Sequence, residues 1–189
     1  DAHGGLDALR YRDDLPAPVL PERGSVRVRL RAAALNHLDL FVLGGIPGVS
    51  IAPGWVMGAD GTGVVAEVSA GVTTVAVGDR VLINPGISCR DCEFCRAGEQ
   101  SLCVRYRLLG EHLPGTFADE VIVPATNVRR CPPTLSDEAA AAFTLATLTA
   151  WRMCVTRAQV TRVDEVLIWG IGGGVALAAL QICKARGAR

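Results

Sequence analysis

The chain has 189 residues, half of them hydrophobic and a fifth charged, which is the balance of a globular protein of one domain or slightly more. Its 19 basic and 19 acidic residues cancel and no basic run occurs, so the composition gives no support for nucleic-acid or membrane-surface binding by charge. No signal peptide opens the chain and no apolar run approaches the roughly 18 residues of a membrane span, so we expect a cytoplasmic protein without a membrane partner.

Short strands separated by glycine and proline are predicted in the first half. Residues 25–35 begin with strict alternation, in which Val26 and Val28 face one side and arginines the other, the pattern of a half-buried strand. A short helical segment is expected over residues 36–43. Further strands are predicted over residues 61–68, 80–83 and 117–123. Short strands separated by glycine and proline favour a small β-barrel or sandwich.

Four of the seven cysteines lie close together, with the spacing C-x2-C-x2-C-x7-C: Cys89, Cys92, Cys95 and Cys103. Four thiolates are the full ligand set of a closed tetrahedral zinc site, which stabilises a loop and leaves no open position for chemistry. An iron–sulfur cluster is the main alternative, but ferredoxin runs place the fourth cysteine after three residues and follow it with proline. Here the gap is seven and Val104 follows. A disulfide pair is the remaining alternative, and it is disfavoured in a reducing compartment.

Helical patterns replace the strands after Cys131. Ser136 is expected to N-cap a helix that has Asp137 and Glu138 in its first turn, where the helix dipole favours acidic groups. The alanine-rich helical pattern then continues toward Cys154, which is predicted to be a buried thiol.

A short apolar strand is predicted over residues 165–169, followed by a glycine turn at 170–174 and a helix over 175–185. Strand, glycine turn and helix form the first unit of a dinucleotide-binding fold, in which the pyrophosphate lies at the helix N-terminus. A lone unit of this kind cannot cover both of its apolar faces. The chain is therefore expected to be truncated.

The glycine turn is weak support for nucleotide binding when it is taken alone. The strict pattern G-x-G-x-x-G would need glycine at Val175, and a wider spacing through Gly170, Gly173 and Ala176 is what the sequence offers. A plain connection between a strand and a helix is an equally good interpretation of this segment.

Taken in order, these parts resemble the medium-chain dehydrogenase/reductase superfamily of zinc alcohol dehydrogenases and quinone oxidoreductases. The landmarks are AALNHLDL (33–40), GADGTGVVAEVSAGVTTVAVGDRV (58–81), the cysteine segment, TLTAWRM (147–153) and VLIWGIGGGVA (166–176). The resemblance implies a mixed α and β fold. A GroES-like β-barrel substrate domain would span residues 1–132, and a bridging helix with the start of a Rossmann domain residues 133–189. It also implies one structural zinc ion, NADP or NAD, a small carbonyl or quinone substrate, and a homo-oligomeric full-length parent.

The positions of the catalytic zinc ligands depart from the alcohol dehydrogenase pattern. Alcohol dehydrogenases of this family hold a second zinc ion with cysteine, histidine and cysteine, and the matching positions are Asn36, Ala59 and the neighbourhood of Leu145. None of these side chains replaces a thiolate or an imidazole as a ligand. The resemblance therefore implies the zinc-free quinone oxidoreductase branch, whose members reduce quinones, enals or enones, although that branch commonly lacks the cysteine segment.

Asn36 is expected to polarise the substrate carbonyl, with the alternative that it only satisfies the backbone at a helix start. By resemblance, Asp39 and Asp60 would orient neighbouring groups in the catalytic cleft rather than act as acids. Thr149 would approach the nicotinamide and His37 the pyrophosphate. The cofactor-binding residues expected from the glycine turn are Gly170, Gly172, Gly173, Gly174 and Ala176.

Two other functions stay open. One is a non-catalytic GroES-like module for binding or assembly, and the other is an alcohol dehydrogenase with unorthodox catalytic zinc ligands. The candidate ligands for such a site are His37, Asp39, Asp60, Glu111 and His112.

Overall fold

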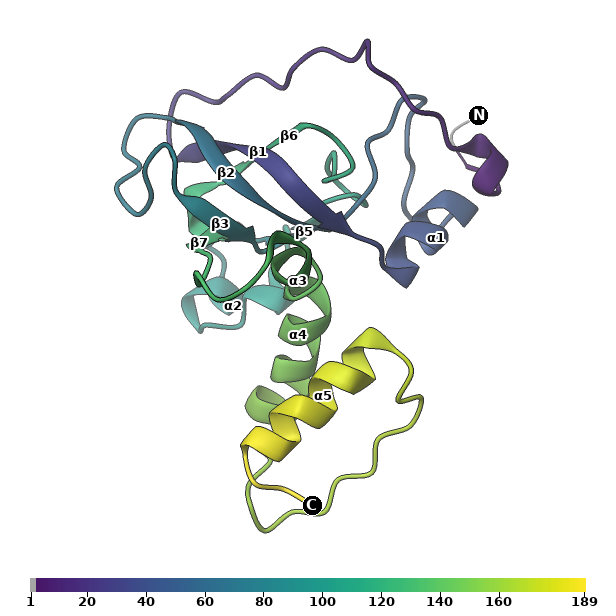
Figure 1. Cartoon of the computed structure of the whole chain (residues 1–189), viewed down its shortest axis with the longest axis vertical. Helices are drawn as coiled ribbons and strands as arrows, with labels where there is room; N and C mark the ends of the chain where they lie inside the picture. Colours follow the sequence, from purple (N-terminus) through teal and green to yellow (C-terminus); the bar gives the residue numbers. More distant parts are fainter. Residues whose placement is uncertain (1–2) are drawn as a thin grey trace. The chain divides into compact units, whose positions relative to one another are not determined.

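The structure is a computed structural model that describes residues 3–189 and divides into two compact units, Asp1–Ala142 and Phe143–Arg189 (Figure 1). The first unit contains all the β-strands, and the second is built from helices and an extended segment. The mixed α and β fold expected from the sequence is confirmed.

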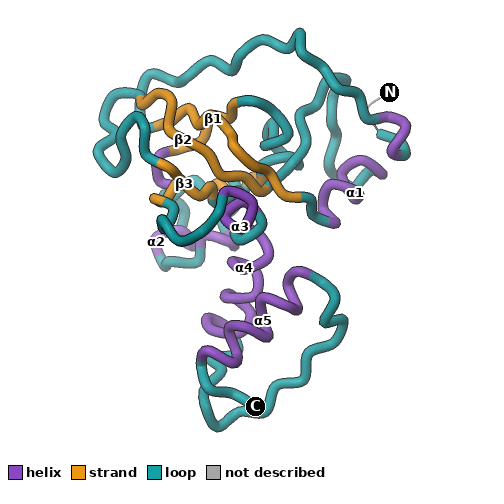
Figure 2. Tube along the Cα trace, viewed as in Figure 1, coloured by secondary structure: helices purple, strands orange, loops and turns teal. Residues whose placement is uncertain are grey.

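A five-stranded sheet in the order β6-β1-β2-β3-β7 forms the body of the first unit, and every pairing in it is antiparallel. Strands are the orange segments of Figure 2. Its strands are β1 (Ser25–Ala34), β2 (Asp60–Val68), β3 (Arg80–Ile83), β6 (Glu120–Pro124) and β7 (Val128–Arg130). In β1, Val26 and Val28 are fully buried, as the alternation predicted. The strand expected from residue 117 begins instead at Glu120, because the N–H of Phe117 donates to the carbonyl of Met57 outside the sheet.

Strands β1 and β2 approach each other very closely at one point. Gly63 in β2 lies opposite Leu30, next to a shift of register between Leu30 and Ala32. A Cβ atom at Gly63 would lie 2.1 Å from the carbonyl oxygen of Arg29. Glycine is therefore required at this irregularity of the sheet.

The core of the first unit lies against the sheet and is almost wholly aliphatic. Its buried members are Val26, Val28, Val65, Val75, Val81, Ile83, Leu109, Val121, Val123, Ala125 and Val128. A smaller cluster belongs to helix α1 (His37–Gly44) and the loop that follows it. Its buried members are Val42, Leu43, Ile51 and Met57.

Helix α3 (Asp137–Ala141) packs against β1, β2 and β3. The Oγ of Ser136 accepts the N–H of Ala139 at 3.2 Å, so the predicted N-cap is confirmed. Arg80 on β3 donates through Nε to Asp137 Oδ1 at 2.6 Å and through Nη2 to the carbonyl of Leu135 at 2.5 Å. These bonds fasten the segment before α3 to the sheet.

The cysteine segment forms a separate lobe between two short paired strands, β4 (Gly86–Ile87) and β5 (Arg107–Leu108). Within the lobe are helix α2 (Glu93–Arg96) and the 3-10 turn η2 (Gln100–Leu102). Two further 3-10 turns occur in this unit, η1 (Leu6–Ala8) and η3 (Ala125–Asn127).

The second unit contains α4 (Thr144–Trp151), the π-helical turn η4 (Arg152–Arg157) and α5 (Gly174–Ala185). Helix α5 matches the helix predicted over residues 175–185. The buried core residues of this unit are Ala150, Cys154, Val160, Ala179, Ile182 and Cys183. Across residues 3–189, no helix has the length and apolar character needed to cross a bilayer.

The strand predicted over residues 165–169 is not formed, and this prediction was wrong. The N–H of Val166 donates to the carbonyl of Arg189 at 2.7 Å, and the N–H of Arg189 donates to the carbonyl of Asp164 at 3.0 Å. These two bonds have the pattern of a parallel ladder, but a strand needs a row of partners, and in the described part of this unit Arg189 alone supplies them. The segment is extended, and Leu167 and Trp169 are 80% and 85% exposed.

Candidate functional site

The four cysteines of the lobe converge on one point. Their sulfur atoms all lie within 4.8 Å of one another, and the Sγ atoms of Cys89 and Cys95 are 3.9 Å apart. Four Zn–S bonds of about 2.3 Å place tetrahedral sulfur atoms about 3.8 Å apart. The cluster therefore has close to the dimensions of a zinc ligand set. The chain carries no disulfide among these residues.

Backbone N–H groups point at the sulfur atoms. Cys92 N donates to Cys89 Sγ at 3.3 Å, and Cys89 N donates to Cys103 Sγ at 3.2 Å. The N–H of Arg105 also reaches Cys103 Sγ at 3.3 Å. Such bonds favour the thiolate over the thiol and fix the orientation of each ligand.

Two of the four thiols, those of Cys89 and Cys95, differ widely in pKa. The backbone N–H of Asp91 and the side chain of Arg105 lower the pKa of Cys89 to about 5, whereas burial raises the pKa of Cys95 to about 11. A divalent cation deprotonates its coordinating thiols outright, which would bring both groups to the same charged state. The donor set therefore fits a structural zinc ion. The contribution of Arg105 was not foreseen, although a cation two residues after the last cysteine was the signal for it.

Asn36 precedes α1 and is half-buried. Its backbone N–H donates to Asp39 Oδ2 at 2.7 Å. Its side-chain Nδ2 donates to Asp60 Oδ2 at 3.1 Å and faces the carbonyl of Ala34 at 3.4 Å. The nitrogen expected to polarise a substrate carbonyl is thus directed at groups of the protein.

Two carboxylates beside Asn36 are buried, with Asp39 7% and Asp60 1% exposed. Burial raises the pKa of Asp39, and the backbone N–H groups of Asn36 and Gly58 act in the opposite direction. The backbone carbonyl of Asp60 accepts the hydroxyl of Thr116 at 2.8 Å. Thr116 is itself buried, and no spacing or motif in the sequence pointed to it.

A second metal site is not assembled from the other candidate ligands. Within residues 3–189, the lobe cysteines are the only cluster of three or more potential ligands. Ala59 is fully buried and offers a methyl group where the zinc alcohol dehydrogenases carry histidine. His37 is exposed, with its ring 6.2 Å from that of Phe41. Glu111 and His112 form a pair at 3.7 Å without a third ligand.

The glycine turn of the second unit leaves its backbone open. Gly170 has φ of 67°, and a Cβ atom at Gly170 or Gly172 would meet nothing within 4 Å. Gly173 is the N-cap of the twelve-residue helix α5, which begins at Gly174 and carries Ala176 in its first turn. An open glycine backbone at a helix N-terminus suits the negative charge of a phosphate.

Thr149 lies on α4 in this same unit and is exposed. Its hydroxyl donates to the carbonyl of Leu145 at 2.8 Å, one turn earlier in the helix. The structure therefore assigns the expected cofactor-binding glycines and Thr149 to one unit, and Asn36, His37 and Asp39 to the other.

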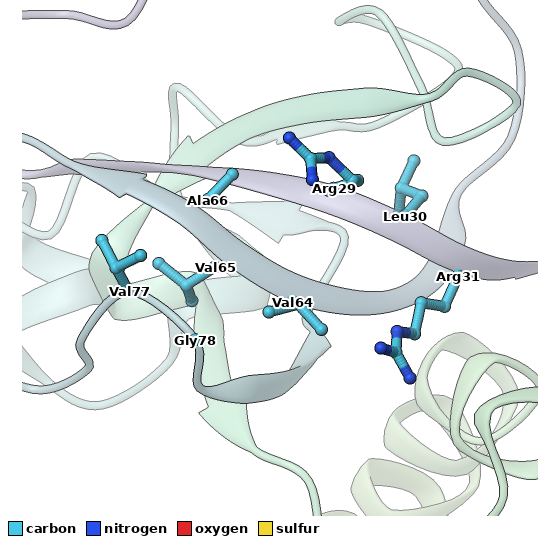
Figure 3. A pocket seen from close by; sticks show the side chains of 8 residues that line it. All are labelled: Arg29, Leu30, Arg31, Val64, Val65, Ala66, Val77 and Gly78. Atoms are coloured by element: carbon cyan, nitrogen blue, oxygen red, sulfur yellow. The ribbon is translucent and has the colours of Figure 1, made fainter.

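Two surface hollows lie in the first unit. One, of about 440 Å³, is apolar and is lined by Leu40, Phe41, Gly44, Gly45, Ile46 and Pro47. The other, of about 350 Å³, lies on β1 and β2, and its lining residues are Arg29, Leu30, Arg31, Val64, Val65, Ala66, Val77 and Gly78 (Figure 3). The second hollow contains neither an acid nor a nucleophile, and its two arginines already face the carboxylates of Glu120 and Asp137 at 3.7 and 3.6 Å.

Comparison with known proteins matches residues 22–133 to the alcohol dehydrogenase GroES-like domain. The acryloyl-coenzyme A reductase of Metallosphaera sedula is 35% identical over 98% of this chain and 54% of its own length. An alcohol dehydrogenase of Schizosaccharomyces pombe is 32% identical over 99% of this chain and 53% of its own. A solved structure of an NAD-dependent alcohol dehydrogenase is 50% identical, with a TM-score of 0.93, over all of this chain and 54% of that one. The chain thus spans about half the length of these relatives.

Proposed function

Because the chain belongs to the alcohol dehydrogenase GroES-like domain family, we propose that its protein is an NAD(P)-dependent oxidoreductase with one structural zinc ion. In this proposal residues 1–132 form the substrate domain, and residues 133–189 contain the bridging helix and the first part of the cofactor domain. The substrate is a small molecule, and the expected assembly is a homo-oligomer.

The reaction we propose is the reduction of quinones, enals or enones without a catalytic zinc ion. One observation carries this proposal. The lobe retains all four of its cysteines, whereas Asn36 and the buried methyl group of Ala59 stand where alcohol dehydrogenases hold the catalytic metal. The relative from Metallosphaera sedula supports this direction, because the acryloyl group in its name is a conjugated carbonyl.

The residues of this chain would bind and orient the reactants. The nicotinamide cofactor supplies the hydride when it is bound. The open backbone of the glycine turn, from Gly170 to Gly174 with Ala176 behind it, would hold the pyrophosphate, and Thr149 of the same unit would lie near the nicotinamide. The apolar hollow beside α1 suits the ring of a quinone or the chain of an enal.

Alcohol oxidation is the second candidate, since the chain is 50% identical to a structure described as an NAD-dependent alcohol dehydrogenase. It would need ligands for a catalytic zinc ion beyond those that the described residues bring together.

The test is to wash the purified protein with a chelator, measure zinc per chain and then assay both directions. We expect about one zinc per chain and oxidation of NADPH or NADH by a quinone or an enal, without a response to added zinc. Oxidation of alcohols that depends on a second zinc ion would favour the second candidate. Tight binding of one zinc without turnover in either direction would instead indicate a non-catalytic binding module.

A further inference from the structure

The side chain of Asp60 contacts Asn36 in the candidate site. Its carboxylate is almost completely buried, and its Oδ2 atom lies 3.1 Å from the Nδ2 of Asn36. The Nδ2 atom of Asn36 donates to Asp60 Oδ2, so the end of the amide that faces this carboxyl group is the nitrogen end. This contact therefore decides which way round the Asn36 amide lies.

The positions of the other polar atoms of the Asn36 amide follow from that orientation. The other N–H of Nδ2 is directed at the carbonyl of Ala34, 3.4 Å away. The amide oxygen Oδ1 is then the polar atom at the opposite end of this half-buried side chain. It has two lone pairs, and the capping box at the start of α1 uses at most one of them.

The backbone around this contact is fixed on both sides. Ala34 and Asp60 are directly paired across β1 and β2, at the end where Asn36 leaves the sheet. The carbonyl of Asp60 is held by the buried hydroxyl of Thr116 at 2.8 Å, and the backbone N–H of Asn36 is held by Asp39. These bonds hold the backbone of both partners in place.

We propose that Asp60 is a positioning residue, which holds the nitrogen of the Asn36 amide inward and so presents the oxygen Oδ1 to the substrate. The inference rests on the proposed function and deepens it. Asn36 is then a hydrogen-bond acceptor in the site, and among quinones, enals and enones it favours those that also carry an O–H or N–H group at that point. It does not polarise a carbonyl oxygen, in contrast to the role predicted from the sequence.

Side-chain amide signals of asparagine test the contact directly, by NMR on protein labelled with [15N]asparagine. The chain has only three asparagines, Asn36, Asn84 and Asn127. Asn127 serves as an internal reference, because its Nδ2 donates to two carbonyl oxygens rather than to a carboxylate. We expect an Asn36 proton shifted downfield of those of Asn127 and protected from solvent exchange.

Asp60→Asn should remove that shift and speed the exchange of the Asn36 amide protons about tenfold, as expected for the loss of a buried hydrogen bond. Glu67→Gln is the matched control on the same strand, since its carboxylate is exposed and pairs with Arg27 instead. Asn36 signals in the wild-type protein that are unshifted and exchange as fast as an unfolded amide would overturn the proposal, even if the Asp60→Asn protein did not fold.

Kinetics separate positioning from a general effect on stability. Asp60→Asn should lower kcat about tenfold with little change in the KM for the nucleotide, and it should have no further effect in an Asn36→Ala background. Additive losses in the double variant would mean that Asp60 acts independently of Asn36, which contradicts the proposal. A shifted Asn36 signal in a protein without reductase activity would refute the proposed function and leave the contact confirmed.

Discussion

Burial and hydrogen bonding shift the pKa values of several single side chains in this protein. In the lobe, the pKa of Cys89 lies at about 5 and that of Cys95 at about 11, although the two sulfur atoms are only 3.9 Å apart. In the first turn of α1, burial raises the pKa of Asp39. Each case gives a prediction that one substitution can test.

Cys89→Ser should abolish stoichiometric zinc binding and unfold the lobe, because a serine hydroxyl is a poor zinc ligand and structural zinc contributes on the order of 10 kcal/mol to folding. Metal analysis and limited proteolysis of residues 86–108 would show the loss. Cys131→Ser, outside the cluster, is the control and should retain about one zinc per chain. Equal zinc content in both variants would refute the assignment of the ligands.

Asp39→Asn should raise the melting temperature near neutral pH and leave it almost unchanged near pH 3.8, the ordinary pKa of aspartate. Because burial raises the folded-state pKa of Asp39, its contribution to stability is fully present below the unfolded pKa and is lost as the pH rises through the folded pKa. The amide removes that loss and keeps an oxygen for the N–H of Asn36. Thermal melts of both proteins across this pH range give the comparison. A variant that is less stable than the wild type at neutral pH would contradict the prediction.

The roles of some of these residues could be predicted from the sequence and those of others could not, for a physical reason. The zinc ligands were predictable because all four lie in one short segment, where spacing nearly determines geometry. The contact between Asn36 and Asp60 was not, because it joins residues 24 positions apart that meet only through the pairing of β1 with β2. Spacing along the chain does not contain that information.

At the scale of elements, patterns within one segment were predicted well and those that need a partner were not. Strand β1 and helix α5 follow from their own periodicity, with bounds close to those expected. The segment 165–169 has the composition of a strand but lacks a row of neighbours to bond with, and so it remains extended and exposed. Glycine is likewise required at position 63 because the backbone of β1 lies so close, and the sequence of β2 alone does not show this.

Gly63→Ala should destabilise the sheet by at least about 2 kcal/mol, since the new methyl group would overlap the backbone of Arg29 and force the strands apart. Gly44→Ala is the matched control, because it ends α1 with open space around it and should be neutral or slightly stabilising. Chemical denaturation followed by circular dichroism would measure both changes. Similar stabilities for the two variants would show that the strands can separate at little cost.

At the scale of the whole molecule, the two units differ in the size of their cores. The first has a sheet with eleven buried residues in its main cluster, and the second has six in the 47 residues from Phe143 to Arg189. Units of about this size are only marginally stable by themselves. We therefore expect amide hydrogens of α4 and α5 to exchange with solvent much faster than those of β1 and β2 in this 189-residue chain.

Hydrogen exchange read by mass spectrometry would measure this difference. The sheet should show the slowest class of amide hydrogens, because its central strands open only on global unfolding of the first unit. Equal protection of α5 and β2 would mean that the two units unfold together as one cooperative body.

The pairing of β4 with β5 makes the zinc lobe a detachable module. Gly86 lies opposite Leu108 and Ile87 opposite Arg107, so the two ends of the lobe are adjacent where they join the rest of the fold. A tight turn that joins those two strands could replace the residues between them without a change in the strand order of the five-stranded sheet. An ancestor could therefore gain or discard the metal-bound lobe in a single insertion or deletion, and an engineer could transplant it in the same way.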